Sequence, residues 1–184
     1  MGKARRIGAL AGIGIILAVL LLSHRFGRAE PTGSYRPELA PDALEIGCFP
    51  LPGGAALDFV YQIRRDGDRE IGGEMRRLLV GQYDEIDEPE ALDAIVADFV
   101  EAGFVASGRP SPYDAVLRKP SAGRVDVVRV SVEQFSGIEE DTLVRGTFEL
   151  DLPAVELSAD APAVCSDPKA TKRFSYGLGL PWVP

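Results

Sequence analysis

The chain has 184 residues, of which 46% are hydrophobic and 26% charged, so its length and composition fit one ordinary folded domain and exclude general disorder. It contains 20 Lys and Arg residues against 28 Asp and Glu, and a single histidine, His24. A chain this acidic is a poor nucleic-acid binder, because phosphate contacts need clustered Lys and Arg, and the region after His24 has no imidazole for catalysis.

The N-terminal segment, residues 1–28, contains basic residues and no acid. Residues 7–23 form an uncharged apolar run, at the lower limit for a transmembrane helix, since about 20 residues cross the hydrocarbon core. More bases precede the run than follow it, which keeps the N-terminus in the cytoplasm and places the rest outside. We therefore expect residues 1–28 to anchor the chain in the inner (cytoplasmic) membrane. The alternative is a signal peptide cleaved near Ala29, which would leave a secreted protein.

Small residues recur inside this apolar run. Gly8 and Gly12 are four positions apart, a spacing that allows a second membrane helix to approach closely. They are candidates for helix packing in the membrane. Glycine is also common in membrane helices that have no such partner, and this alternative stays open.

A proline-containing stretch over residues 29–43 follows the anchor. Such a stretch favours an extended, polyproline-like chain at about 3.1 Å per residue. We expect it to be a linker between the anchor and an extracytoplasmic domain over residues 44–166.

Cys48 and Cys165 lie near the two ends of that domain. In an exported chain, two widely spaced cysteines favour one structural disulfide that joins the start of the domain to its end. Two free, buried thiols are the alternative. Neither a CxxC motif nor a nearby histidine accompanies them, so the sequence predicts no metal centre, redox site or cofactor here.

The first elements of the domain are predicted to be strands. Residues 58–65 alternate, with Phe59, Tyr61 and Ile63 on one face, and the dipeptide Asp66-Gly67 predicts a turn after them. Residues 73–83 combine helix formers with strand formers, and we interpret them as the strand that returns from this turn.

One main helix is predicted over residues 88–102. Asp87 and Glu90 have the spacing of a capping box, and Gly103 followed by Phe104 is typical of a helix end. The apolar residues that recur at intervals of three and four are Leu92, Ile95, Val96, Phe99 and Val100. One face of this helix is therefore expected to be buried.

Three further strands are predicted over residues 113–119, 124–135 and 142–152, the last two with apolar and polar side chains that alternate from Val128 and from Val144 onward. Alternation of this kind indicates an antiparallel sheet with one solvated face. The expected fold class is α+β: an N-terminal transmembrane helix, then a small domain in which one amphipathic helix lies across the inner face of an antiparallel sheet.

Charges on the two long strands predict how they pair. If Val130 lies opposite Phe148, two pairs of opposite charge face each other, Arg129 with Glu149 and Glu133 with Arg145. We expect this register. A shift by two residues, which would pair Val130 with Gly146 or Leu150, would contradict it.

An acidic cluster before the helix includes Asp84, Glu85 and Asp87. Carboxylates are ligands that Ca²⁺ prefers, so these residues are candidates for a cation site. No EF-hand pattern surrounds them, and the helix dipole favours acids at a helix start, so a solvated helix cap explains the same residues.

The C-terminal tail, residues 167–184, is basic and aromatic after Asp167. Its distinctive residues are Lys172, Arg173, Phe174, Tyr176 and Trp182. Aromatic and basic residues are common anchors of protein interfaces, so the tail is a candidate docking segment. The alternative is that it packs back on its own domain, near Cys165.

The organisation of the chain predicts a non-enzymatic, membrane-anchored binding or assembly module, which would be an accessory protein or subunit of an envelope complex with a protein partner. This reading predicts a solid core and an exposed apolar patch. A lipid- or small-ligand-binding domain would instead have an apolar cavity between sheet and helix. A carboxylate-based envelope hydrolase would have two acids of raised pKa in one cleft.

Overall fold

The computed structural model describes residues 41–173, except residues 122, 140–141 and 158–159. The expected anchor, with Gly8 and Gly12, and most of the expected linker lie outside this part of the chain. So does the tail from Phe174 onward. Among the helices of the described residues, none is long and apolar enough to cross a membrane.

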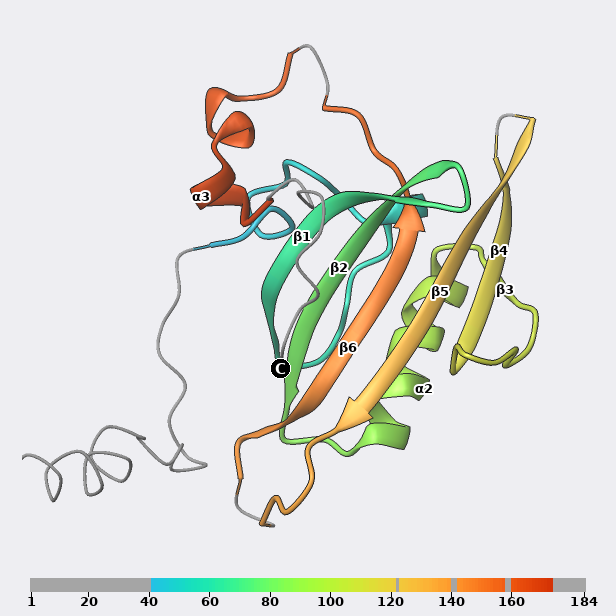
Figure 1. Cartoon of the computed structure of the whole chain (residues 1–184), viewed down its shortest axis with the longest axis vertical. Helices are drawn as coiled ribbons and strands as arrows, with labels where there is room; N and C mark the ends of the chain where they lie inside the picture. The colour runs from blue at the N-terminus through green and yellow to red at the C-terminus, as the bar shows by residue number, and fades with distance from the viewer. Residues whose placement is uncertain (1–40, 122, 140–141, 158–159, 174–184) are drawn as a thin grey trace, which may run out of the picture. The chain divides into compact units, whose positions relative to one another are not determined.

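The described domain is α+β, with one antiparallel sheet and one main helix, as the alternation in the sequence predicts (Figure 1). Its strands lie side by side in the order β1-β2-β6-β5-β4-β3. In chain order their bounds are β1 Tyr61–Ile71, β2 Glu74–Asp84, β3 Val105–Ala106, β4 Ala115–Ser121, β5 Arg124–Gln134 and β6 Val144–Pro153. The helix α2, Glu88–Glu101, covers one face of the sheet, called the inner face below. Short helical turns are η1 (Pro52–Gly54), η2 (Ala163–Ser166) and α3 (Pro168–Thr171).

Helix α2 begins and ends where the sequence predicts. The Asp87 carboxylate accepts a hydrogen bond from the Glu90 amide (3.0 Å), and the Glu90 carboxylate accepts one from the Asp87 amide (3.2 Å), which is the expected capping box. At the other end Gly103 has φ +87°, and Phe104 donates its amide to the Phe99 carbonyl. These contacts satisfy backbone groups that the helix itself leaves unpaired.

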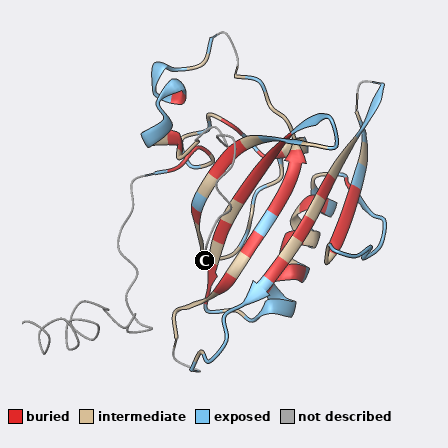
Figure 2. Ribbon diagram, in the orientation of Figure 1, coloured by how far each residue is buried: buried red, intermediate tan, exposed pale blue. Residues whose placement is uncertain are grey.

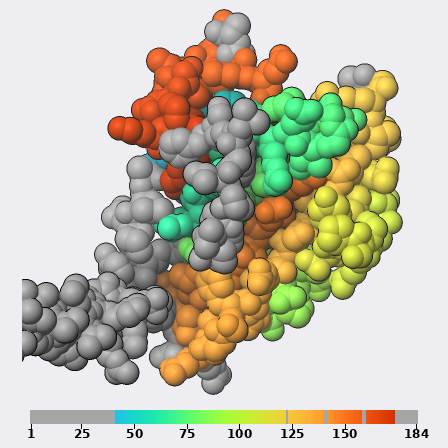
Figure 3. All heavy atoms as spheres, in the orientation of Figure 1, coloured from blue at the N-terminus to red at the C-terminus, as the bar shows by residue number. Residues whose placement is uncertain are grey.

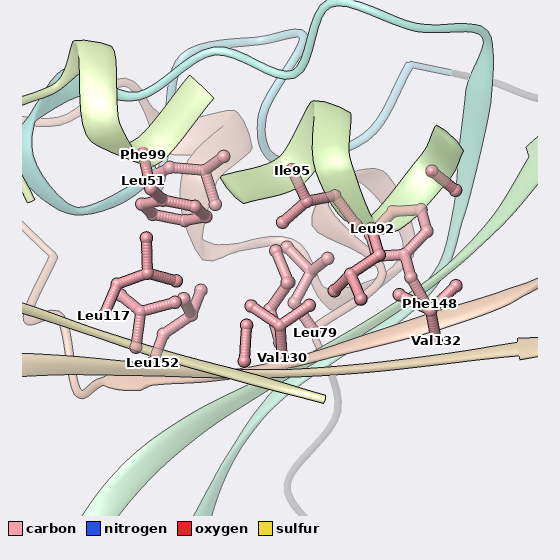
Figure 4. Close-up of a cluster of buried hydrophobic side chains, with 14 of the residues drawn as sticks. Leu51, Leu79, Leu92, Ile95, Phe99, Leu117, Val130, Val132, Phe148 and Leu152 are labelled. Atoms are coloured by element: carbon pink, nitrogen blue, oxygen red, sulfur yellow. The ribbon is translucent and has the colours of Figure 1, made fainter. Parts of the chain in front are cut away.

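The core lies between α2 and the inner face of the sheet (Figure 4). Leu92, Ile95 and Phe99 point from the helix toward the strands. The strand residues beneath them include Leu79, Leu117, Val130, Phe148 and Leu152, all buried. Each such side chain contributes about 1.5–3 kcal/mol when fully buried, so this interface is the main source of stability. Figure 2 shows the resulting alternation of burial along the strands.

The first hairpin differs from the prediction, because β1 does not turn at Asp66-Gly67. The strand continues to Ile71, and the turn is Gly72-Gly73, with φ of +61° and +84°. Two successive residues with positive φ match the twist of a two-residue hairpin, and glycine adopts that conformation without a steric penalty. Asp66 is fully buried in the strand and forms an ion pair with Arg77.

The predicted register of β5 and β6 is wrong by two residues, because Val130 pairs with Leu150. Arg129 therefore lies opposite Asp151 instead of Glu149. The Asp151 carboxylate accepts hydrogen bonds from Arg129 (2.6 Å) and also from Arg76 of β2 (2.7 Å). The observed register thus gives one buried carboxylate two cationic partners, an arrangement that a comparison of β5 and β6 alone does not reveal.

Cys48 and Cys165 are joined by a disulfide, as predicted. The bond links the segment before β1 to η2, across a sequence separation of 117 positions. The two ends of the described domain are therefore held together covalently.

Candidate docking surface

The acidic candidates before α2 take separate structural roles. Asp84 is buried at the end of β2, Glu85 has φ +65° and donates its amide to the Leu143 carbonyl, and Asp87 caps the helix. Within the described residues, no group of three or more His, Cys, Asp or Glu side chains is placed to hold a metal ion. The helix-cap interpretation therefore accounts for Asp87.

The start of the tail packs against its own domain. The Lys172 carbonyl accepts a hydrogen bond from the Asp66 amide (3.2 Å), and the Lys172 ammonium donates to the Ile63 carbonyl (3.2 Å). The Arg173 guanidinium lies 4.1 Å from the ring centroid of Phe49. Phe174, Tyr176 and Trp182 lie outside the described residues, so their expected docking role remains a prediction.

A charge cluster fixes this arrangement, and we call it the buried charge cluster after its two buried members, Asp66 and Arg77; the partly exposed Asp68 and Arg173 complete it. Arg77 is fully buried and donates two hydrogen bonds to the Asp66 carboxylate (2.9 and 2.7 Å) and one to the Pro50 carbonyl (3.1 Å). Arg173 donates to Asp66 (2.8 Å) and to Asp68. The sequence analysis missed this cluster. The available signal was Arg77, which alternation places on the same face of the strand as Leu79 and Tyr83.

Among the described residues, the two carboxyls with clearly raised pKa lie on opposite sides of the sheet. Burial is the main cause that raises the pKa of Asp98 on α2, which packs on the inner face. Burial also raises the pKa of Glu149, although Arg69 opposes the shift. Glu149 lies between the inward-facing residues Phe148 and Leu150 on β6, so its side chain points to the outer face. These two acids therefore do not form a catalytic pair.

Two tyrosines, the buried Tyr83 and the partly buried Tyr61, remain neutral phenols near neutral pH. Burial, assisted by Glu88, Asp87 and Glu133, raises the pKa of Tyr83 to about 12. Burial also raises the pKa of Tyr61, together with nearby carboxylates. The Tyr83 hydroxyl donates a hydrogen bond to the Glu133 carbonyl (3.4 Å), which links the end of β2 to β5.

An ionic row crosses the outer face of the sheet from strand to strand. It consists of Arg76, Asp151 and Arg129, on β2, β6 and β5. Arg76 also donates to the Val127 carbonyl (2.7 Å), and the Arg129 guanidinium lies 5.6 Å from the ring centroid of Tyr113. Because its members are already paired with one another, the row is a structural feature, and it connects the β1–β2 half of the outer face with the β3–β5 half.

An exposed apolar patch occupies the β3–β5 half. Val127 pairs with Arg118, which also pairs with Val105, and Val125 pairs with Pro120, so these side chains share the outer face. We call Val105, Pro120, Val125 and Val127 the valine patch. Val105 is 68% exposed and Val125 is 53% exposed. In Figure 1, β5 crosses in front of α2, so the reader looks at the outer face of the sheet. Figure 3 has the same orientation and shows the β4–β5 hairpin on the right of the molecule.

The valine patch could have been noticed in the sequence. Val125 and Val127 have the same parity as Arg129, Ser131 and Glu133, so alternation alone assigns them to the polar face of the strand. Val105 had no such signal, because β3 has only two residues.

Comparison with protein-family models, curated proteins and solved structures found no match.

Proposed function

We propose that the chain is a single-pass, membrane-anchored binding module that works outside the cytoplasmic membrane with a protein partner. In this proposal residues 1–28 are the anchor, with the N-terminus in the cytoplasm, and residues 29–43 are the linker. The disulfide between Cys48 and Cys165 supports an extracytoplasmic location, because such bonds persist in oxidising compartments.

The observation that carries the proposal is the valine patch. Apolar side chains gathered on one exposed surface are unfavourably hydrated, and such patches are typical of protein–protein contacts. Arg118 lies among these valines and is exposed. A fitting partner surface would present apolar side chains to Val105 and Val125 and a carboxylate to Arg118.

The packing between α2 and the sheet favours this function over ligand binding. Ile95, Phe99, Leu79 and Leu150 are all 0% exposed and meet in the space where a ligand cavity was expected. A ligand would have to displace these side chains. A carboxylate hydrolase has less support, because Asp98 and Glu149 are separated by the sheet.

The test is the replacement Val125→Glu in the full-length chain, compared with Val100→Glu as a matched control. Val100 is 47% exposed, close to the value for Val125, but it lies on α2 and outside the valine patch. Each chain would be purified from its native membranes in mild detergent, and co-eluting proteins would be quantified by mass spectrometry.

We expect a stoichiometric protein partner with the unaltered chain and with Val100→Glu, and its loss with Val125→Glu. A chain that elutes alone would contradict the binding function. Equal loss with both variants would show that the valine patch is not the contact surface.

A further inference from the structure

Strand β5 carries apolar side chains on both faces of the sheet. Val128 and Val130 belong to the core beneath α2, whereas Val125 and Val127 point to the outer face. On the inner face, α2 contacts β5 and also its neighbours β4 and β3 (Figure 1). A strand that is apolar on both faces is typical of a sheet with a helical layer on each side. The outer face of these three strands is therefore the kind of surface that a helix covers.

The edge of the sheet beside the valine patch offers little to a partner strand. The edge strand β3 has only two residues, Val105–Ala106. Beyond it, Pro120 of β4 has no amide hydrogen to donate. Strand addition needs a row of free backbone donors and acceptors along an edge. A partner at the valine patch is therefore expected to contact the outer face through its side chains.

The dimensions of the valine patch match one helix. β3 and β5 lie on either side of β4, so the patch spans about 10 Å across the strands, at about 4.8 Å per interval. Val125 and Val127 are two positions apart on β5, which is about 7 Å. A helix is about 10 Å in diameter and rises about 6 Å between residues i and i+4. One helix laid along the strands would thus reach both valines from two successive turns.

A second sheet would fit this surface less well than a helix. Packed sheets cover several strands, and the strand next to β5 is β6, which presents Glu149 and Asp151 to the outer face. On β5 itself, Val127 is followed on this face by Arg129, which is paired with Asp151. Covering these charges would remove them from water, which is unfavourable. A helix on the β3–β5 half leaves β6 uncovered.

Arg118 sets the charge that the partner must carry. It is exposed between two valines, because it pairs with Val105 on one side and with Val127 on the other. Its Nε donates to the Ser107 hydroxyl (3.4 Å), and none of the ion pairs among the described residues includes it. A second copy in symmetric contact through the valine patch would bring two Arg118 side chains together, which repel each other. A different protein with a carboxylate fits better.

We propose that the partner packs one acidic, amphipathic helix on the valine patch, on the opposite side of the strands that α2 covers. Apolar side chains three and four positions apart on this helix contact Val105, Val125 and Val127, and a carboxylate one turn away pairs with Arg118. The inference rests on the proposed function and adds the kind of partner segment.

Photo-crosslinking of the full-length chain in its native membranes tests the helix. The probe p-benzoylphenylalanine stands in place of Val125 in one chain and of Val105 in a second. In a control chain it stands in place of Val100, on α2 and outside the valine patch. Cross-linked peptides are sequenced by mass spectrometry. We expect both probes in the patch to capture one segment of one partner, at residues spaced three, four or seven apart, and the control to miss that segment.

A synthetic peptide with the sequence of the captured segment tests the charge. Arg118→Glu in the full-length chain should weaken binding of this peptide by about 10-fold or more, because a charge-assisted pair is lost. A second peptide, with lysine in place of the carboxylate, should recover most of that loss. Arg124→Glu is the matched control, since Arg124 is exposed but outside the valine patch, and it should leave binding within about 2-fold.

The outcomes distinguish this inference from the proposed function. If no partner co-elutes with the unaltered chain, both fail. If a partner protein is captured at the valine patch but its captured residues follow the two-residue spacing of a strand, only the helix is wrong. Peptide binding that is absent, or equal for Arg118→Glu and the unaltered chain, would overturn the acidic helix in the same way. Cross-links to lipid or to a second copy of the chain would also overturn it.

Discussion

Arg77 shows how one side chain links three distant parts of the chain. It is fully buried, it binds Asp66 of the neighbouring strand through two hydrogen bonds, and it donates to Pro50 in the segment before β1. Arg173 then binds the other side of the same Asp66 carboxylate. Every charge in this cluster has a partner of opposite sign, which is the condition under which buried charges are tolerated.

Replacement of Arg77 by leucine should lower the free energy of unfolding by about 3–5 kcal/mol, because the Asp66 carboxylate stays buried and loses one cationic partner. The matched control is Arg124→Leu. Arg124 pairs with Asp126 through a side chain that is 68% exposed, and we expect a loss of at most about 1 kcal/mol. Urea unfolding of both variants measures the difference. Equal, small losses would show that the buried cluster contributes no more than a surface pair.

The buried charge cluster was not predictable from local sequence. Asp66-Gly67 is a common turn dipeptide, and nothing in its neighbourhood indicates that Asp66 is paired with Arg77 and Arg173. Only the three-dimensional placement of the tail brings Arg173 back to β1, from 107 positions away. Residue patterns predict side-chain faces well and long-range ion pairs poorly.

At the level of elements, Gly81 helps to fix how β2 pairs with β6. It lies opposite Phe148, whose ring occupies the space above it, and a Cβ at Gly81 would lie 2.2 Å from that ring. No rotation of a Cβ can relieve such an overlap, so either the ring or the strand would have to move. The close contact between Gly81 and the Phe148 ring therefore helps to fix the position of β6 relative to β2.

We expect Gly81→Ala to destabilise the domain by about 1–3 kcal/mol, as overpacking does. Phe148→Leu should recover part of this loss, because a leucine leaves room for the added methyl group. A double-mutant cycle measured by thermal unfolding tests the coupling. If the loss in the double variant equals the sum of the two single losses, the proposed contact does not restrict the pairing.

The elements themselves were largely predictable, whereas their pairing was not. The helix from Glu88 depends on a local capping box and a local apolar stripe, and the strands depend on alternation. The turn of the first hairpin and the register of β5 with β6 depend on contacts from other elements. Arg76 and Gly81 both belong to β2, which lies next to β6, and neither enters a comparison of β5 with β6.

For the whole molecule, the disulfide between Cys48 and Cys165 should contribute about 2–5 kcal/mol, because it restricts a long loop of the unfolded chain. The double variant Cys48→Ser/Cys165→Ser should unfold at correspondingly lower urea concentration than the oxidised protein. A reducing agent should shift the unaltered chain to the same midpoint and leave the variant unchanged. A midpoint for the oxidised protein equal to that of the variant would contradict this contribution.

The same covalent bond has a mechanical consequence. The chain enters the described domain ahead of Cys48 and continues beyond Cys165. If the segment before Cys48 were pulled in one direction and the segment after Cys165 in the other, the contacts of Lys172 and Arg173 with β1 would yield first, and tension would then pass from one cysteine to the other through two sulfur atoms. The sheet and α2 lie within the closed loop between them and would bear none of that load. Force applied between the two ends of the domain would therefore bypass the sheet and α2.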